Sequence, residues 1–164
     1  MSGKVFFMNV FCILKNEILL VSNAIKFLLE NHPNSVFYVF IEYSFSFKET
    51  QEKVLKIYQE INIENNPTFD LLVIPLDSIP SICPDLIIVG QDQQLINKYP
   101  NTPKINIPYE ISPIKITKSI ENNINKFDIV CLGGTFDHLH YGHKLLLTMA
   151  AFLCKKTLIC GVTG

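Results

Sequence analysis

The stretch that most constrains the fold lies near the C-terminus, at residues 127–162, and reads FDIVCLGGTFDHLHYGHKLLLTMAAFLCKKTLICGV. An apolar run from Ile129 to Leu132 leads into the glycine pair Gly133 and Gly134. A helical pattern follows, and then a second apolar run. This order predicts a βαβ unit with its polar residues at the turn. Ligands of such units bind at the carboxyl end of the strand, where a helix N-terminus favours phosphate.

Composition limits the class of protein. The chain has 164 residues, of which 48% are apolar and 18% charged, so we expect a substantial core and no global disorder. A net charge of −1 gives no reason to expect a nucleic-acid partner, and the composition does not indicate an oligomeric state. No apolar run approaches the roughly 20 residues of a membrane span. Five cysteines without a CxxC pair predict reduced thiols and a cytoplasmic location.

Strands and helices alternate through the N-terminal part of the chain. We predict strands at residues 5–14, 36–41, 69–76, 85–89 and 105–107, and helices at 17–31, 46–61 and 93–98. The apolar stripe of the helix at 46–61 is Val54, Leu55, Tyr58 and Ile61. Such alternation favours a mostly parallel sheet, and therefore the α/β class.

The chain divides in two at a polar segment. Residues 111–126 carry Pro113, two lysines in the run KITK and three asparagines, which is typical of a linker. We therefore predict an N-terminal α/β domain of unknown role at 1–110, a linker at 111–126, and the first βαβ unit of a second domain at 127–164.

The turn residues favour chemistry on phosphate. Gly133 and Gly134 let the chain turn sharply and let a phosphate approach the main chain. Thr135 places a hydroxyl at the strand end. A helix that begins near Leu139 would carry His140 and His143 on one face of its first turn, and Gly142 would leave room for a substrate. Two imidazoles and helix N–H groups suit phosphoryl or nucleotidyl transfer, whereas glycoside chemistry needs a carboxylate pair. Zinc binding by His138, His140 and His143 would need a further ligand, so no metal site is predicted.

The run from Gly133 to Lys144, GGTFDHLHYGHK, resembles the HxGH nucleotidyltransferases of the cytidylyltransferase-like superfamily. Within it, the run looks most like the eukaryotic and archaeal phosphopantetheine adenylyltransferases. This resemblance implies a Rossmann-like fold and the transfer of AMP from ATP to 4′-phosphopantetheine, with Mg²⁺ assisting. The products would be dephospho-coenzyme A and pyrophosphate, in coenzyme A biosynthesis.

The resemblance also implies a role for each matched residue. Thr135 would position the attacking phosphate, His143 would bind the ATP phosphates and stabilise the transition state, and His140 would face the triphosphate. Gly142 would pack against the nucleotide. The nucleotide- and phosphate-binding set is completed by Gly133, Gly134 and Phe136.

Two alternatives stay open: cytidylyl transfer to a phospho-alcohol, which shares the tetrad, and a non-catalytic α/β interaction module. Family members carry a phosphate-contacting lysine soon after the second strand and, later, an ISSTxIR-like segment. Neither occurs within residues 1–164, so we expect little or no turnover by this chain alone.

Residues around the tetrad have simpler interpretations. Asp137 is expected to cap the helix or to order the loop. Lys155 and Lys156 are interpreted as cations at the helix end. The expected core residues are Cys131, Cys160, Leu145, Leu146, Met149 and Phe152.

Overall fold

A computed structural model describes residues 7–14, 18–41, 47–59, 69–75, 81–90, 94–109 and 126–163. The chain forms two compact units. The first comprises Met1–Glu42 and Glu60–Lys115, and the second comprises Tyr43–Gln59 and Ile116–Gly164. The segment at 43–59 thus groups with the C-terminal unit, although the sequence places it in the N-terminal domain. The domain boundaries drawn from the sequence stay a prediction, and the predicted linker lies outside the described residues except for Lys126.

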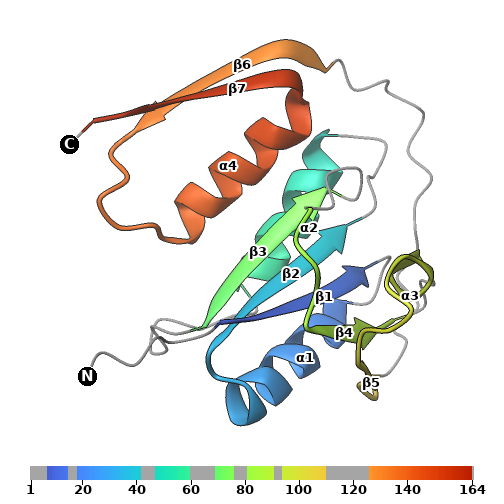
Figure 1. The fold of residues 1–164 in the computed structure, drawn as a ribbon. Coiled ribbons are helices and arrows are strands. Elements are labelled where there is room, and N and C mark those ends of the chain that lie inside the picture. Colours follow the sequence, from blue (N-terminus) through green and yellow to red (C-terminus); the bar gives the residue numbers. More distant parts are fainter. Residues whose placement is uncertain are drawn as a thin grey trace, which may run out of the picture. The chain divides into compact units, whose positions relative to one another are not determined.

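The first unit is built on a five-stranded sheet in which neighbouring strands are parallel (Figure 1). Its strand order is β3-β2-β1-β4-β5. Along the chain, the elements of this unit are β1 (Met8–Leu14), α1 (Ile18–Asn31), β2 (Ser35–Ile41), β3 (Asp70–Pro75), β4 (Leu86–Val89), α3 (Gln94–Lys98) and β5 (Lys104–Asn106).

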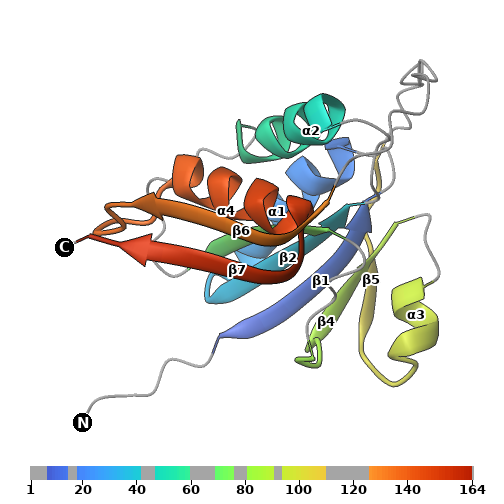
Figure 2. The same cartoon turned by 90° about the horizontal axis from the view of Figure 1, so that it is seen from above.

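Helices α1 and α3 cover opposite faces of this sheet (Figures 1 and 2). The order of the strands explains this arrangement. The connection from β1 to β2 runs one way across the sheet and that from β4 to β5 runs the other way. Because crossovers between parallel strands are right-handed, two opposite directions place the helices on two faces. This is the Rossmann-like α/β architecture expected from the sequence.

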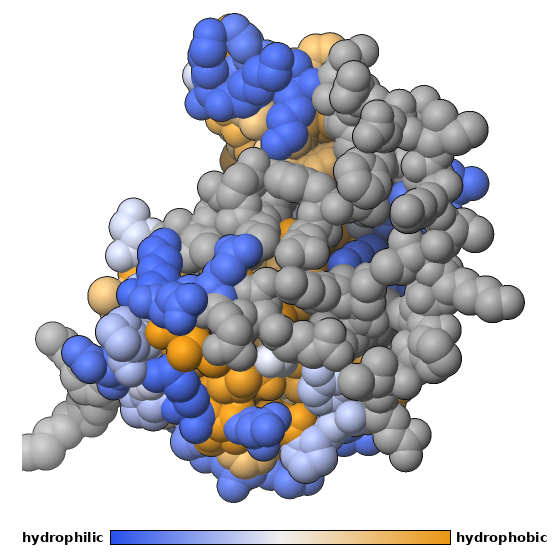
Figure 3. Space-filling model, turned by 90° about the vertical axis from the view of Figure 1, so that its right-hand side faces the viewer, coloured by the Kyte–Doolittle hydropathy of each residue, from blue (hydrophilic) through white to orange (hydrophobic). Residues whose placement is uncertain are grey.

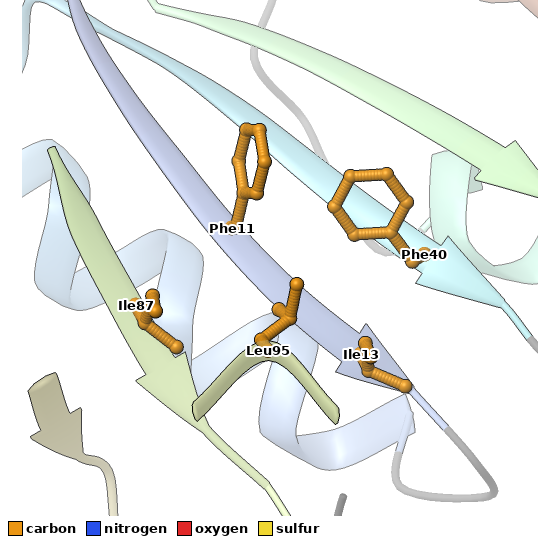
Figure 4. Packing of buried hydrophobic residues seen from close by; sticks show 5 residues of the cluster. All are labelled: Phe11, Ile13, Phe40, Ile87 and Leu95. Carbon is orange, nitrogen blue, oxygen red and sulfur yellow. The ribbon is translucent and has the colours of Figure 1, made fainter. Parts of the chain in front are cut away.

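The core on the α3 face is aromatic and aliphatic. Phe11 and Phe40 are fully buried, and their ring centroids lie 5.0 Å apart in an edge-to-face contact. Leu95 of α3 packs over the strands that carry them (Figure 4). The cluster consists of Phe11, Ile13, Phe40, Ile87 and Leu95. Alternate residues of each strand point to this face, so the period-two pattern of the strands builds the core.

The second unit contains the βαβ unit that the sequence predicts. Its elements are α2 (Phe47–Gln59), β6 (Phe127–Gly134), α4 (Tyr141–Leu153) and β7 (Cys154–Val162). Strands β6 and β7 pair in parallel, from Phe127 opposite Cys154 to Gly134 opposite Val162. Helix α4 joins them and buries Thr148, Met149, Ala150 and Phe152.

The predicted elements are confirmed within a few residues of their expected ends, but some residues were assigned to the core wrongly. Cys131, Cys160 and Leu146 are exposed, because among the described residues a two-stranded sheet with one connecting helix cannot cover every apolar side chain. On α2, Leu55 is 38% exposed and Ile57 is buried in its place. All five cysteines are free thiols, as expected.

Lys155 and Lys156 lie in β7 and not at a helix end, which corrects their interpretation as helix-dipole cations. The Nζ atom of Lys156 lies 2.6 Å from a carboxylate oxygen of Asp128 on β6. Both side chains are largely exposed, so this ion pair contributes little to stability.

No helix in the described part of the chain is long and apolar enough to cross a membrane. The face drawn in Figure 3 shows apolar residues in orange between hydrophilic residues in blue.

Candidate functional site

The candidate site lies where β6 ends and α4 begins. Strand β6 ends at Gly134, and α4 starts at Tyr141 with His140 as its N-cap. The helix therefore starts two residues later than Leu139, where the sequence analysis placed it. The dipole of α4 places positive potential at this end of the helix. An anion would be favoured at this end of α4.

His140 caps α4 with its own ring. Its backbone is extended, with φ −102° and ψ 174°, and its Nδ1 atom accepts a hydrogen bond from the backbone N–H of Gly142 at 3.1 Å. A Cβ at position 142 would lie 2.9 Å from Cε1 and 3.0 Å from Nδ1 of this ring. Gly142 is thus needed for the cap, and the His140 ring lies where the sequence analysis left room for a substrate. Of the two roles expected of Asp137, capping is wrong because His140 is the N-cap, and ordering of the loop stays a prediction.

The structure brings the two histidines of the tetrad together. The ring centroids of His140 and His143 lie 3.9 Å apart at an interplanar angle of 28°, which is a stacked arrangement. On another side, the ring of Phe136 lies 4.8 Å from that of His143. The Nδ1 atom of His143 is 3.1 Å from the backbone carbonyl oxygen of His138. The two imidazoles are therefore held in place by a cap, a carbonyl and an aromatic ring.

These contacts assign the ring protons. Nδ1 of His140 accepts a hydrogen bond, so its proton is on Nε2. A carbonyl oxygen only accepts, so Nδ1 of His143 carries a proton and donates it. In both rings Nδ1 is engaged within the protein, so Nε2 is the ring nitrogen that a ligand would contact.

Thr135 has a partner that the sequence analysis missed. Its hydroxyl oxygen lies 3.1 Å from that of Thr163, just beyond β7. The N–H of Thr163 also donates to the carbonyl of Gly134 at 3.2 Å. The contact between Thr135 and Thr163 could have been expected from the predicted parallel pairing, since the carboxyl ends of adjacent parallel strands meet at one edge of the sheet.

The remaining predicted site residues lie at the same strand end. Gly133 and Gly134 pair with Gly161 and Val162 at the close of the β6–β7 ladder. His138 is exposed, as expected, and takes part through its carbonyl. Within the described ranges, no group of three or more His, Cys, Asp or Glu side chains could hold a metal ion. The chemical roles assigned to Gly133, Gly134, Thr135, Phe136, His140, Gly142 and His143 stay predictions.

Replacing Gly142 by alanine should displace the His140 ring. The new Cβ would overlap the imidazole, so the cap and the stack on His143 are both lost. Loss of a cap costs about 0.5–2 kcal/mol, and alanine in place of glycine returns up to about 1 kcal/mol of helix propensity. We expect a nearly unchanged free energy of unfolding together with a clear shift of the His140 imidazole resonances, measured by NMR.

Gly161→Ala is the matched control, because a Cβ there would meet only the carbonyl oxygen of Leu132 at 3.8 Å, an ordinary contact. Imidazole resonances that stay in place in Gly142→Ala would contradict the steric account of this glycine.

Comparison with known proteins shows what this segment is similar to. Residues 131–164 match the family model described as cytidylyltransferase-like, so the resemblance of this segment to the cytidylyltransferase-like superfamily is confirmed.

Two curated relatives are similar to the chain. Phosphopantetheine adenylyltransferase of Saccharomyces cerevisiae is 56% identical over 39 residues, which are 24% of this chain and 13% of that protein. An uncharacterized protein of Schizosaccharomyces pombe is 33% identical over 107 residues, which are 65% of this chain and 29% of that protein. The chain thus spans less than a third of the length of either relative. No solved structure matches the chain.

Proposed function

We propose that this protein is a nucleotidyltransferase that transfers AMP from ATP to 4′-phosphopantetheine, giving dephospho-coenzyme A and pyrophosphate. The observation that carries the proposal is the stacked pair His140 and His143 at the N-terminus of α4. The 56% identity of a 39-residue match to a phosphopantetheine adenylyltransferase supports this substrate pair over cytidylyl transfer.

In the proposed mechanism the chain positions the two substrates and stabilises the transition state, and it forms no covalent intermediate. His143 and His140 would bind the triphosphate, and His143 would stabilise the negative charge that develops on the reacting phosphate. Thr135 and Thr163 present two hydroxyls at the strand end, where the acceptor phosphate would be held. The positive end of the α4 dipole would favour the same anion.

Magnesium would enter with the nucleotide. Mg²⁺ prefers oxygen ligands, and the triphosphate supplies them, whereas the tetrad offers ring nitrogens. We therefore propose Mg-ATP as the species that binds. A cytoplasmic location stays a prediction.

The test is a calorimetric titration of residues 1–164 with Mg-ATP and, separately, with 4′-phosphopantetheine. We expect saturable binding of Mg-ATP that is lost in His143→Ala and kept in His138→Ala. Stronger binding of Mg-CTP than of Mg-ATP would contradict adenylyl transfer and favour cytidylyl transfer. The absence of binding to both nucleotides, by a chain whose circular dichroism shows it folded, would contradict a nucleotide site in this segment.

A further inference from the structure

Helix α2 supports the site helix through aromatic pairs at both of its ends. The rings of Tyr58 on α2 and Tyr141 on α4 are stacked, with centroids 5.7 Å apart at an interplanar angle of 28°. At the other end of α4, the rings of Phe47 and Phe152 lie 6.4 Å apart. The N-terminus of α2 therefore lies beside the C-terminus of α4, so the two helices run antiparallel.

The spacing of the two pairs is the same on both helices. Tyr58 follows Phe47 by eleven residues, and Phe152 follows Tyr141 by eleven. Eleven residues are about three turns and about 16 Å along a helix, so each helix presents both rings on one face. Two straight helices can thus form both contacts at once. Tyr58 is only 2% exposed, which shows that its contact is a buried one.

The first turn of α4 needs such support. It reads Tyr141-Gly142-His143-Lys144, with a glycine at its second position and no acidic residue to complement the helix dipole. Its cap depends on the His140 ring, and its first backbone hydrogen bond runs from the N–H of Lys144 to the carbonyl of His140 at 3.1 Å. Fraying of this turn would separate the two stacked imidazoles.

We infer that Tyr58 is a positioning residue for the tetrad: its ring holds Tyr141, and Tyr141 fixes the turn that presents His140, Gly142 and His143. The effect of Tyr58 on catalysis rests on the proposed function, whereas its effect on the position of the imidazoles does not. Residues 47–59, which the sequence places in an N-terminal domain of unknown role, thereby gain a function in shaping the site.

The experiment compares Tyr58→Leu, which removes the ring and keeps apolar bulk, with Tyr58→Phe, which keeps the ring. Phe47→Leu is the matched control, because it removes the ring at the far end of the same two helices. The measurements are the imidazole resonances of His140 and His143 and the hydrogen exchange of the Lys144 amide, all without ligand. Tyr141→Leu is measured in place of Tyr58→Leu if the latter does not fold.

We expect Tyr58→Leu to shift both imidazole signals and to speed hydrogen exchange of the Lys144 amide by about 2- to 12-fold. This is the factor by which losing one aromatic pair changes the equilibrium constant for opening of the turn. Tyr58→Phe should restore the wild-type values, and Phe47→Leu should leave them unchanged. Unchanged signals in Tyr58→Leu, or equal changes in Phe47→Leu, would overturn the inference.

A parallel Mg-ATP titration separates this inference from the proposed function. Weaker binding in Tyr58→Leu, restored in Tyr58→Phe, would support both. If wild type binds no Mg-ATP, the proposed function fails, while the ligand-free NMR measurements still decide the role of Tyr58.

Discussion

In a longer chain that also carries the phosphate-contacting lysine and the ISSTxIR-like segment, His143→Ala should reduce adenylyl transfer by about 10²–10³-fold in kcat, the usual effect of losing one preorganised donor to a transition state. His143 is the histidine of the pair whose Nδ1 atom lies 3.1 Å from the backbone carbonyl oxygen of His138, which leaves Nε2 for the reacting phosphate. Alanine removes that donor and leaves the hydrogen bond that caps α4 at His140. The fold should therefore remain, and the loss should appear in kcat measured by pyrophosphate release.

His138→Ala is the matched control for this prediction. It removes an exposed imidazole two residues before the cap and keeps the carbonyl that His143 uses. Its kcat should stay within a few-fold of wild type, because the alanine variant keeps the backbone carbonyl that contacts His143. Near-normal turnover by His143→Ala would remove His143 from the mechanism.

Phe11→Ala should lower the free energy of unfolding of the first unit by about 3–5 kcal/mol, because it opens a cavity in a packed core. Phe11 is fully buried on β1, and its ring makes edge contacts with three aromatic neighbours, Tyr38, Phe40 and Tyr99, at centroid distances of 5.1, 5.0 and 6.1 Å. Each such contact adds about 0.5–1.5 kcal/mol beyond the buried area. Urea unfolding followed by circular dichroism measures the change.

Phe7→Ala provides the comparison with the same side chain just before the same strand. Phe7 is 47% exposed, so its removal should cost well under half as much as that of Phe11. Equal losses for the two variants would mean that burial on β1 does not set the stability of this unit. Since the chain has two units, the unfolding curve is fitted without assuming one cooperative transition.

Much of the fold could be read from local patterns. The apolar run before Gly133, the helical spacing after Tyr141 and the second apolar run predicted β6, α4 and β7. These patterns are recognisable within a short segment, because strand and helix periodicities span only a few residues. The i, i+3 spacing of His140 and His143 predicted that both imidazoles would lie near one face of the first turn, and the structure shows the two rings stacked with their centroids 3.9 Å apart. The start of α4 was placed two residues early, because the cap is a histidine ring and not the oxygen side chain that a capping rule looks for.

Other features depend on contacts between residues distant in sequence. Thr163 lies 28 residues after Thr135, and only the parallel pairing of β6 with β7 brings their hydroxyls together. The exposure of Cys131 depends on how many elements cover the sheet, which an apolar pattern does not specify.

The α/β class followed from the alternation of strand and helix patterns along the chain, and the βαβ unit and the tetrad followed from spacing within residues 127–162. Tertiary packing set the strand order β3-β2-β1-β4-β5, the position of the His140 ring over Gly142, and the grouping of α2 with α4 through Tyr58 and Tyr141. The partners in packing depend on the folded chain as a whole. An apolar stripe on a helix indicates that one face is buried, but it does not indicate which element covers that face.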